Sequence, residues 1–232
     1  MRYSFAGLTV EMSPKYDMLL SRAEKYLTDS QANPDIVIDV PDEIFADYKE
    51  AHPFLSDEEC EYMLFGTVFY HRLVNFDGIM LHSSAISYKG EAYVFSADCG
   101  TGKSTHTALW MREFAGDTVM INDDKPSIRI IDGKIMCCGT PFSGKNDISE
   151  NRLYPLKAIA FISRAETNSI EPIPPSVSIP LIMGQTMRKF GEKSAERFLS
   201  LLSDILTAVP VYSLKCNMDP EAAYVALRGM NK

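Results

Sequence analysis

The eight residues from Ala97 to Ser104 have the composition of a loop that binds the phosphate groups of a nucleotide. Gly100 and Gly102 let the backbone wrap closely, so that successive N–H groups can point at a triphosphate. The N-terminus of a following helix would add partial positive charge. We expect Lys103 to reach the outer phosphates and the Ser104 hydroxyl to join the shell of a Mg²⁺ ion.

This loop misses the strict pattern of phosphate-binding loops at one position, because Ala97 stands where the first glycine belongs. Residues 92–95 predict a strand before the loop, and a helix is expected after it, which is the context that the motif requires. The other interpretation is an ordinary glycine-rich turn between a strand and a helix. The nucleotide-binding residues expected from the motif are Asp98, Cys99, Gly100, Thr101, Gly102, Lys103, Ser104 and Thr105.

Two adjacent carboxylates, Asp123 and Asp124, follow a short apolar stretch about 20 residues beyond Lys103. Phosphoryl transfer needs a carboxylate near Mg²⁺, and a kinase needs one that accepts the proton of the acceptor hydroxyl. Adjacent residues of an extended chain point in opposite directions, so at most one should face the metal unless the strand has ended. Two carboxylates repel a triphosphate in the absence of a cation, which predicts a metal requirement. The other interpretation is a solvated turn.

The elements around these motifs predict an α/β fold with a mixed β-sheet, because the chain contains both hairpins and crossovers. A tight turn at Lys89-Gly90 joins two strands before the loop, and Asp132-Gly133 predicts a second hairpin. The helix after the loop is expected to bury Ala108, Met111 and Ala115. The expected strands cover residues 79–87, 91–96, 118–121, 127–131, 134–138, 156–163 and 209–214.

The division expected for the chain is a small α+β portion, residues 1–75, packed on a phosphate-loop core, residues 76–232. In the first portion, Ser56 and Glu59 form a capping-box pattern that predicts a helix of about five turns. Its expected buried residues are Cys60, Met63, Leu64 and Val68.

The C-terminal part is expected to contain a proline-rich loop, a long helix, a strand and a final helix. The loop covers residues 171–180, and the long helix has an apolar stripe. Asp219 is the expected cap of the final helix, with Pro220 in its first position. The stripe consists of Phe198, Leu201, Leu202 and Ile205.

The composition limits the classes of partner. The chain has 232 residues, of which 46% are hydrophobic, and a formal net charge of -8. This charge argues against a general affinity for nucleic acid or anionic membranes. No apolar run approaches the roughly 20 residues that span a bilayer, and residues 1–5 do not resemble a secretion signal. Five cysteines without a CxxC pair favour a reduced, cytoplasmic setting. A homo-oligomer is compatible with all of this.

Three smaller groups are interpreted as structural rather than chemical. Cys99 lies inside the loop, where its oxidation would block nucleotide binding. We nevertheless favour a purely structural role for Cys99 over a redox role. Cys137 and Cys138 should point to opposite sides of a strand and serve packing. The last group, Arg188, Lys189 and Lys193, is interpreted as a solvated basic face.

Several motifs together resemble the HPr serine kinase/phosphorylase family, whose nucleotide-binding core is shared with the PEP carboxykinases. They are residues 81–85, the hairpin before the loop, residues 96–105, 122–124 and 139–141. The resemblance implies a mixed-sheet fold of that type and phosphoryl transfer from ATP with Mg²⁺. In it, Lys103 and Ser104 match the loop's lysine and its metal-linked hydroxyl. Asp123 matches the catalytic base, with Asp124 beside it as metal ligand, and His82 matches a histidine near the phosphates.

Two regions depart from that family. The stretch from Cys137 to Lys145 lacks the glutamate that helps to hold the metal, which puts the second metal contact and HPr itself as substrate in doubt. Lys145 could contact a phosphate or be a solvated loop lysine. Residues 1–75 do not resemble the family's usual N-terminal domain.

The leading hypothesis is a Mg²⁺-dependent ATP phosphotransferase that phosphorylates a hydroxyl, such as a serine, of a peptide, protein or small molecule. In this hypothesis Asp123, Lys103 and His82 are catalytic, and Ser104 and Asp124 bind the metal. A second enzyme class, a PEP-carboxykinase-like decarboxylase, is weaker because those enzymes are much longer. A third class is a nucleotide-binding sensor or peptide-recognition module without turnover.

Overall fold

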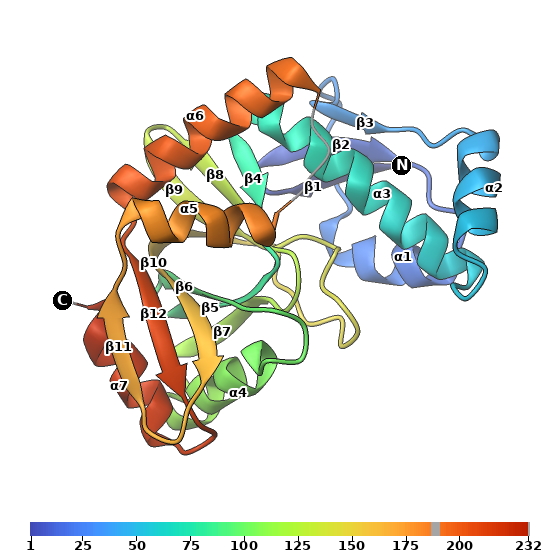
Figure 1. Cartoon of the computed structure of the whole chain (residues 1–232). Helices are drawn as coiled ribbons and strands as arrows, with labels where there is room; N and C mark the ends of the chain where they lie inside the picture. The colour runs from blue at the N-terminus through green and yellow to red at the C-terminus, as the bar shows by residue number, and fades with distance from the viewer. Residues whose placement is uncertain (187–190, 232) are drawn as a thin grey trace.

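The computed structural model describes residues 1–186 and 191–231. In this part, the chain forms a nine-stranded mixed sheet and a separate three-stranded sheet near the N-terminus (Figure 1). The expected α/β class with a mixed sheet is therefore confirmed. Arg188 and Lys189 lie outside the described residues, whereas Lys193 is exposed on the long helix near the C-terminus.

The elements alternate along the whole chain. The strands are β1 (Arg2–Phe5), β2 (Leu8–Met12), β3 (Ile36–Ile38), β4 (Gly78–Met80), β5 (Ser83–Tyr88), β6 (Glu91–Ser96), β7 (Thr118–Asn122), β8 (Ser127–Ile131), β9 (Lys134–Cys138), β10 (Leu153–Arg164), β11 (Ser169–Pro172) and β12 (Val211–Cys216). The α-helices are α1 (Asp17–Ala23), α2 (Asp42–Ala51), α3 (Asp57–Leu73), α4 (Lys103–Glu113), α5 (Pro175–Gly184), α6 (Glu192–Ala208) and α7 (Glu221–Met230).

The longest strand, β10, joins the two halves of the large sheet. Its beginning pairs antiparallel with β9, and its remainder pairs in parallel with both β6 and β12. The order across the sheet is β4-β8-β9-β10-β6-β5-β7, with β12 and then β11 added beside β10. Because β6, β10 and β12 are parallel, their carboxyl ends meet at one edge, and the expected phosphate loop follows β6 there.

Helices cover both faces of this sheet. Alternate residues of β6 and β10 face opposite sides, as the period of a strand requires. Val94 and Ile159 lie in a cluster with α5 and α6, whereas Phe95 and Ala160 lie in a cluster with α4 and α7. Figure 1 shows the strands running between these two pairs of helices.

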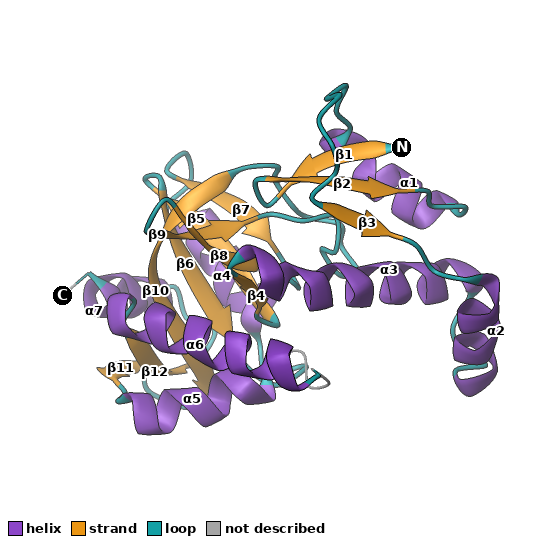
Figure 2. Cartoon of the chain, turned by 90° about the horizontal axis from the view of Figure 1, so that it is seen from above, coloured by secondary structure: helices purple, strands orange, loops and turns teal. Residues whose placement is uncertain are grey.

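The small sheet β1-β2-β3 and helix α3 form a third cluster. Phe5 and Phe69 pack against Phe142, which comes from the loop after β9, with edge-on and tilted ring contacts. Arg129 of β8 links this region to the large sheet, because its guanidinium donates to the carbonyl oxygens of Ala6 at 2.7 Å and Phe76 at 2.9 Å. The two sheets are thus joined by buried apolar and polar contacts, and Figure 2 shows α3 running between them.

Several expected elements are confirmed. Ser56 and Glu59 form the capping box of α3, both hydrogen bonds being present. The hairpin turns at Lys89-Gly90 and Asp132-Gly133 have positive φ at both residues, as two-residue hairpins favour. The apolar stripe of α6 is buried as expected, at Phe198, Leu201, Leu202 and Ile205.

Other expectations were wrong in the placement of helices and faces. Helix α4 buries His106, Thr107, Leu109 and Trp110, whereas Ala108 and Ala115 are exposed and Met111 is partly buried against the same cluster as Trp110. On α3, Met63 is 37% exposed. The proline-rich stretch contains helix α5, since Pro175 occupies its first turn, where a missing N–H costs no hydrogen bond.

Two strand and cap boundaries were also wrong. The strand expected over residues 79–87 is divided into β4 and β5, which pair with different neighbours. The division falls at Leu81 and His82, and it turns His82 away from the regular ladder. The final helix has Pro220 as its cap, one residue later than the expected Asp219.

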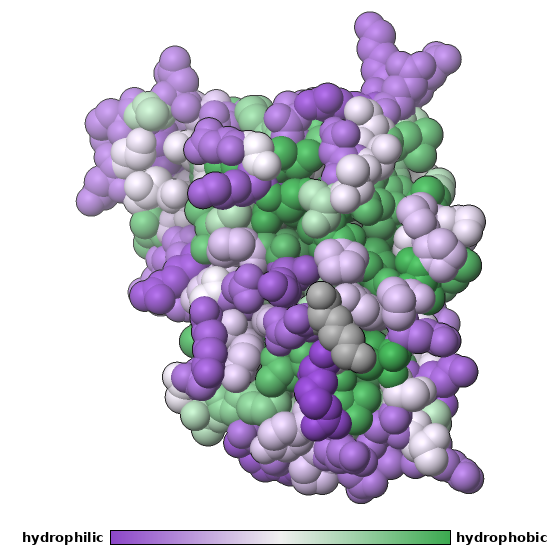
Figure 3. Space-filling model, turned by 90° about the vertical axis from the view of Figure 1, so that its left-hand side faces the viewer, coloured by the Kyte–Doolittle hydropathy of each residue, from purple (hydrophilic) through white to green (hydrophobic). Residues whose placement is uncertain are grey.

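Part of the surface is apolar. Val177, Leu181 and Met183 of α5 and Leu199 of α6 are among the exposed large apolar side chains. Figure 3 shows apolar side chains gathered in the upper half of the face that carries these two helices. No helix in the described part of the chain is both long enough and apolar enough to cross a lipid bilayer.

The capping box gives a test of the fold. The change Ser56→Ala removes the acceptor for the Glu59 N–H, so the free energy of unfolding should fall by about 1 kcal/mol. Ser200→Ala, at an exposed position inside α6, is the matched control and should change it by less than about 0.5 kcal/mol. Urea denaturation of both variants measures the difference, and equal effects would contradict the assigned cap.

Candidate functional site

The loop between β6 and α4 has the backbone of a tight turn. Gly100 and Gly102 have φ of +77° and +123°, values in the region that side chains rarely adopt. A Cβ at either glycine would meet no atom within 4 Å, so backbone conformation rather than space requires glycine there. Lys103 is the first residue of α4, and Ser104 and Thr105 are exposed in its first turn.

Lys103 is directed back across the loop. Its Nζ donates to the carbonyl oxygen of Ala97 at 2.9 Å, and the residue is 9% exposed. Burial lowers the pKa of this ammonium, while the negative charges of Asp124, Asp123 and Asp98 act in the opposite direction. The lysine therefore lies in the field of both expected carboxylates and of the loop's own aspartate.

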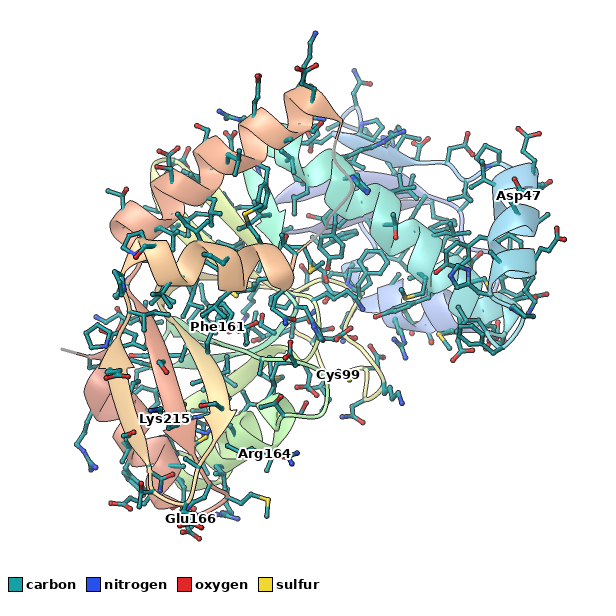
Figure 4. The ribbon with its side chains drawn as sticks, viewed as in Figure 1. Asp47, Cys99, Phe161, Arg164, Glu166 and Lys215 are labelled. Carbon is teal, nitrogen blue, oxygen red and sulfur yellow. The ribbon has the colours of Figure 1, made fainter. Side chains whose placement is uncertain are left out.

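A cavity of about 490 Å³ opens beside the loop. Another cavity, of about 620 Å³, lies in the N-terminal region, away from the loop. The cavity beside the loop lies at the carboxyl ends of β6, β10 and β12, the edge of a parallel sheet where ligands commonly bind. Gly100 and Gly102 line one side, and Ile162, Arg164 and Met218 line others. The guanidinium of Arg164 donates to the carbonyl oxygens of Gly100 and Thr101, at 2.6 and 3.1 Å. Figure 4 shows Arg164 and the loop residue Cys99.

The acidic pair occupies a turn that the side chain of Asn122 fixes. Its Oδ1 accepts hydrogen bonds from the backbone N–H of Asp124 at 3.0 Å and of Lys125 at 2.7 Å. Asn122 is fully buried at the end of β7, and its amide donates to the carbonyl of Thr140 at 3.0 Å. The strand has therefore ended at the pair, and each carboxylate finds partners of its own.

The two carboxylates have different environments. Asp123 Oδ1 accepts from the Ser84 hydroxyl at 2.7 Å, and its Oδ2 has only a long contact of 3.4 Å with the Asn146 amide. Asp124 lies between two bases, with Oδ1 3.3 Å from His82 Nε2 and Oδ2 bound to the Lys125 ammonium. Asp123 is consequently the carboxylate whose Oδ2 has no short hydrogen bond in the described part of the chain. Asp124 is the carboxylate whose charge is balanced by a basic neighbour.

The pKa of Asp124 reflects this competition. Burial pushes the pKa up, but hydrogen bonds and positive charge from His82 and Lys125 outweigh burial and hold it at about 2. Asp124 is therefore ionised throughout the neutral range. Its charge is a fixed part of the site.

His82 connects the acidic pair to the phosphate loop. Its Nδ1 lies 3.0 Å from Gln185 Oε1, and the Gln185 amide nitrogen donates to Asp98 Oδ1 at 2.8 Å. Both ring nitrogens of His82 thus face oxygen atoms of neighbouring side chains. A continuous chain of polar contacts runs from Asp98 through Gln185 and His82 to Asp124.

The loop after β9 closes the other side of the pair. A Cβ on Gly144 would lie 2.7 Å from the Cβ of Asp124, so the backbone approaches the aspartate closely. The Gly144 N–H donates to the hydroxyl of Tyr62 at 3.0 Å, and the Lys125 ammonium lies 5.7 Å from the Tyr62 ring. Lys145 is exposed in this loop.

Five residues near the site were not among the site residues expected from the sequence, although Ser84 and Asn122 lie inside two of the motifs. Gln185 lies 103 residues from His82 in sequence, and Asn122 and Ser84 occupy strand positions that look structural. Lys125 stands next to the acidic pair, and its position could have suggested a counter-charge. The residues missed are Ser84, Asn122, Lys125, Gln185 and Tyr62.

Two cysteines lie at the site: Cys99 is exposed in the loop, and Cys216 lines the cavity beside it. Cys137 and Cys138 are buried in different clusters, so their side chains face opposite sides of β9 as expected. Burial raises the pKa of Cys138 to about 12, and that of Cys137 well above its usual value. Packing is the role that these contacts support.

The ionisation of Asp124 can be tested by measuring the stability of the protein at low pH. Its pKa in the folded chain is about 2, below the usual value near 3.9, so its stabilisation is present above pH ~4 and is lost as pH falls toward 2. The shift corresponds to about 2 kcal/mol. We expect wild type to lose this amount between pH 4 and 2, and Asp124→Asn to lack that loss. Urea unfolding at each pH measures both, and Asp132→Asn, in a hairpin turn, is the control that should titrate like wild type.

Comparisons with known proteins give a weak likeness of fold to solved structures. No protein-family model matches the chain, and no curated protein matches it. Among solved structures, the Hpr(Ser) kinase/phosphatase from Coxiella burnetii is similar over 64% of this chain and 88% of its own, with 9% sequence identity and a TM-score of 0.39. At this level the similarity extends to the fold at most, and the argument about the site rests on the chain's own residues.

Proposed function

We propose that the protein is a Mg²⁺-dependent phosphotransferase that moves the γ-phosphoryl group of ATP to a hydroxyl, such as a serine, of a peptide, protein or small molecule. One observation carries the proposal. The lysine of the phosphate loop lies in the field of a paired carboxylate site, and polar contacts through Gln185 and His82 link the loop to that site. A glycine-rich turn that serves packing alone would not need this convergence of charges.

The phosphate loop would hold the nucleotide. The Lys103 ammonium, now on the carbonyl of Ala97, feels the negative charge of the carboxylates and would turn toward the outer phosphates of a bound triphosphate. The cavity of about 490 Å³ beside Gly100 and Gly102 has space and apolar surface for the base. Exposed Met218 and the planar guanidinium of Arg164 are suitable partners for the faces of a flat ring.

Magnesium fits the residues present if the nucleotide supplies part of its shell. Within residues 1–186 and 191–231, no group of three or more His, Cys, Asp or Glu side chains is arranged to hold a metal. Mg²⁺ usually takes one or two carboxylates together with substrate phosphates, so Ser104 and Asp124 remain the proposed protein ligands. Bound Mg²⁺ would neutralise phosphate charge. The Lys125 ammonium, which now compensates Asp124, would then be free to turn toward a phosphate.

Asp123 is the proposed base that orients the acceptor hydroxyl. Its Oδ1 is fixed by Ser84, while its Oδ2 is left with one long contact and can accept a hydrogen bond from a substrate. His82 would stabilise charge near the phosphates, because its two acceptors hold the ring in place.

A second candidate is a nucleotide-binding sensor without turnover. The observation that favours it is the closed state of Asp124, whose two oxygens already face His82 and Lys125. In addition, the stretch from Cys137 to Lys145 brings no glutamate to the pair. Binding without transfer is the result that this candidate requires.

Two substitutions separate these functions. Lys103→Ala should weaken binding of Mg²⁺-ATP by about tenfold or more, because the outer phosphates lose their counter-charge. Asp123→Asn should keep binding within about threefold and lower the transfer rate by roughly 10²–10⁴. Calorimetry measures the binding, and transfer of γ-labelled phosphate to serine-containing acceptors measures the rate.

The matched control is Lys134→Ala, an exposed lysine of the β8–β9 hairpin, which should leave both quantities unchanged. Transfer by wild type that Asp123→Asn does not reduce would remove Asp123 from the proposed role. Binding by wild type with no transfer to any acceptor would favour the sensor, and absence of nucleotide binding would end both candidates.

A further inference from the structure

A second cavity lies far from the phosphate loop, in the N-terminal region. It has a volume of about 620 Å³ and opens between the ends of the parallel strands β2 and β3 and the helices α2 and α3. The chain leaves β2 toward α1 and leaves β3 toward α2, and the two paths diverge around this space (Figure 1). Helix α2 has no buried residue, so it flanks the cavity as an exposed wall.

The negative charge of the protein is concentrated around this cavity. Residues 31–61 contain ten aspartates and glutamates and one lysine, a net charge of -9. The rest of the chain has 22 lysines and arginines against 21 aspartates and glutamates, a net charge of +1. The total of -8 is therefore local, and this region should attract cationic groups in preference to the rest of the surface.

Two of the carboxylates that line the cavity, Asp39 and Glu61, form no ion pair in the described part of the chain, although the charge of Lys15 acts on Glu61. Glu11 pairs with Arg2 at 3.4 Å, and Asp42 pairs with Lys15 at 2.9 Å. Within the described parts of the chain, no lysine or arginine forms an ion pair with Asp39 or Glu61, which also line the cavity.

Glu61 is the stronger indication, because it is 2% exposed. Its carboxylate accepts hydrogen bonds from the backbone N–H groups of Lys15 at 2.6 Å and Tyr16 at 3.2 Å, and burial raises its pKa. A carboxylate is costly to bury without an opposite charge. A cation that enters the cavity would supply that charge.

The rest of the lining consists of apolar and aromatic side chains together with Ser13 and Lys15. Tyr16 and Phe45 are stacked with their ring centres 6.1 Å apart, and Ile38 and Phe65 are buried beside them. Lysine and arginine side chains suit such a surface, because their hydrocarbon stems pack on apolar groups while their heads reach carboxylates. Aromatic faces attract the same cations.

We propose that this cavity, bounded by β2, β3, α2 and α3, is a docking cleft for a basic peptide segment. Its lining combines carboxylates with apolar and aromatic groups, which matches a segment that carries both basic and apolar side chains. The identification of this segment as part of the phosphate acceptor rests on the proposed function; peptide binding itself does not.

Helix α3 connects the cleft to the candidate site. Glu61 faces the cleft, and its neighbour Tyr62 accepts a hydrogen bond from Gly144, whose backbone lies against Asp124. A segment bound in the cleft is therefore separated from the acidic pair by the thickness of one helix and the loop after β9. A continuation of the same polypeptide could carry a hydroxyl to Asp123.

The experiment measures binding of a fluorescein-labelled peptide of alternating lysine and valine by anisotropy, without nucleotide. Wild type should bind it, and Asp39→Lys should weaken binding by about tenfold or more, since an attraction becomes a repulsion. Glu171→Lys is the matched control, because it makes the same charge change on exposed β11 at the opposite end of the molecule (Figures 1 and 2) and should leave affinity unchanged. Glu61→Gln, checked for folding by circular dichroism, should weaken binding as well.

Four results would overturn the proposal. The first two are equal affinities of wild type and Asp39→Lys for the lysine-valine peptide, and binding of a glutamate-valine peptide by wild type with the same affinity. The third is displacement of the lysine-valine peptide by spermidine at the same concentration. The fourth is a wild-type dimer in sedimentation that Asp39→Lys dissociates. The last two would assign the cleft to a polyamine or to a second copy of the chain. Peptide binding without transfer to a serine placed in the peptide would support the cleft and count against the proposed function alone.

Discussion

The turn after β7 is the constraint on which the candidate site depends. Asn122 is buried at the end of that strand, and its side chain accepts from the two backbone N–H groups that follow the first aspartate. The carbonyl of Lys125 in turn accepts from the hydroxyls of Tyr70 and Thr140. Because all of these groups are buried and paired, the turn cannot relax without leaving polar groups unsatisfied. The directions of both carboxylates follow from it.

This constraint allows like charges to gather. Asp98, Asp123 and Asp124 all act on Lys103, and such a cluster would be unstable without cations close by. Lys103 and Lys125 provide them from two different elements of the fold, and His82 adds a hydrogen bond to Asp124. The arrangement leaves one carboxylate compensated and the other with a freer oxygen, an asymmetry that two adjacent residues could not show in a regular strand.

Local chemistry explains what could be predicted from the sequence. The capping box of α3 and the turns at Lys89-Gly90 and Asp132-Gly133 depend on residues adjacent or three apart, and each was placed correctly. The turn at Ala6-Gly7 has the same positive φ values but was not predicted, because alanine rarely adopts that conformation. The mixed sheet followed from the presence of both hairpins and crossovers.

Tertiary contacts decide the rest. The buried face of α4 is set by Trp110, which packs among Tyr93, Phe95 and Phe114, and helical spacing alone could not choose it over the alanine face. Likewise, the link from His82 to Gln185 spans 103 residues, so no local pattern could contain it. The sequence motifs predicted the site residues themselves. Their hydrogen-bond partners could not be predicted, because distant strands must first pair to bring these residues together.

The double role of β10 has a consequence for how the chain can fold. The hairpins β5–β6 and β8–β9 close over two-residue turns and order little chain, whereas β10 must pair with β9, β6 and β12 across long loops. Closing long loops is entropically expensive and slow, so the two hairpins can form early and β10 completes the sheet later. The edge of β6 that leads into the phosphate loop therefore stays unpaired until residues 153–164 have arrived. A growing chain would have no assembled site before that point.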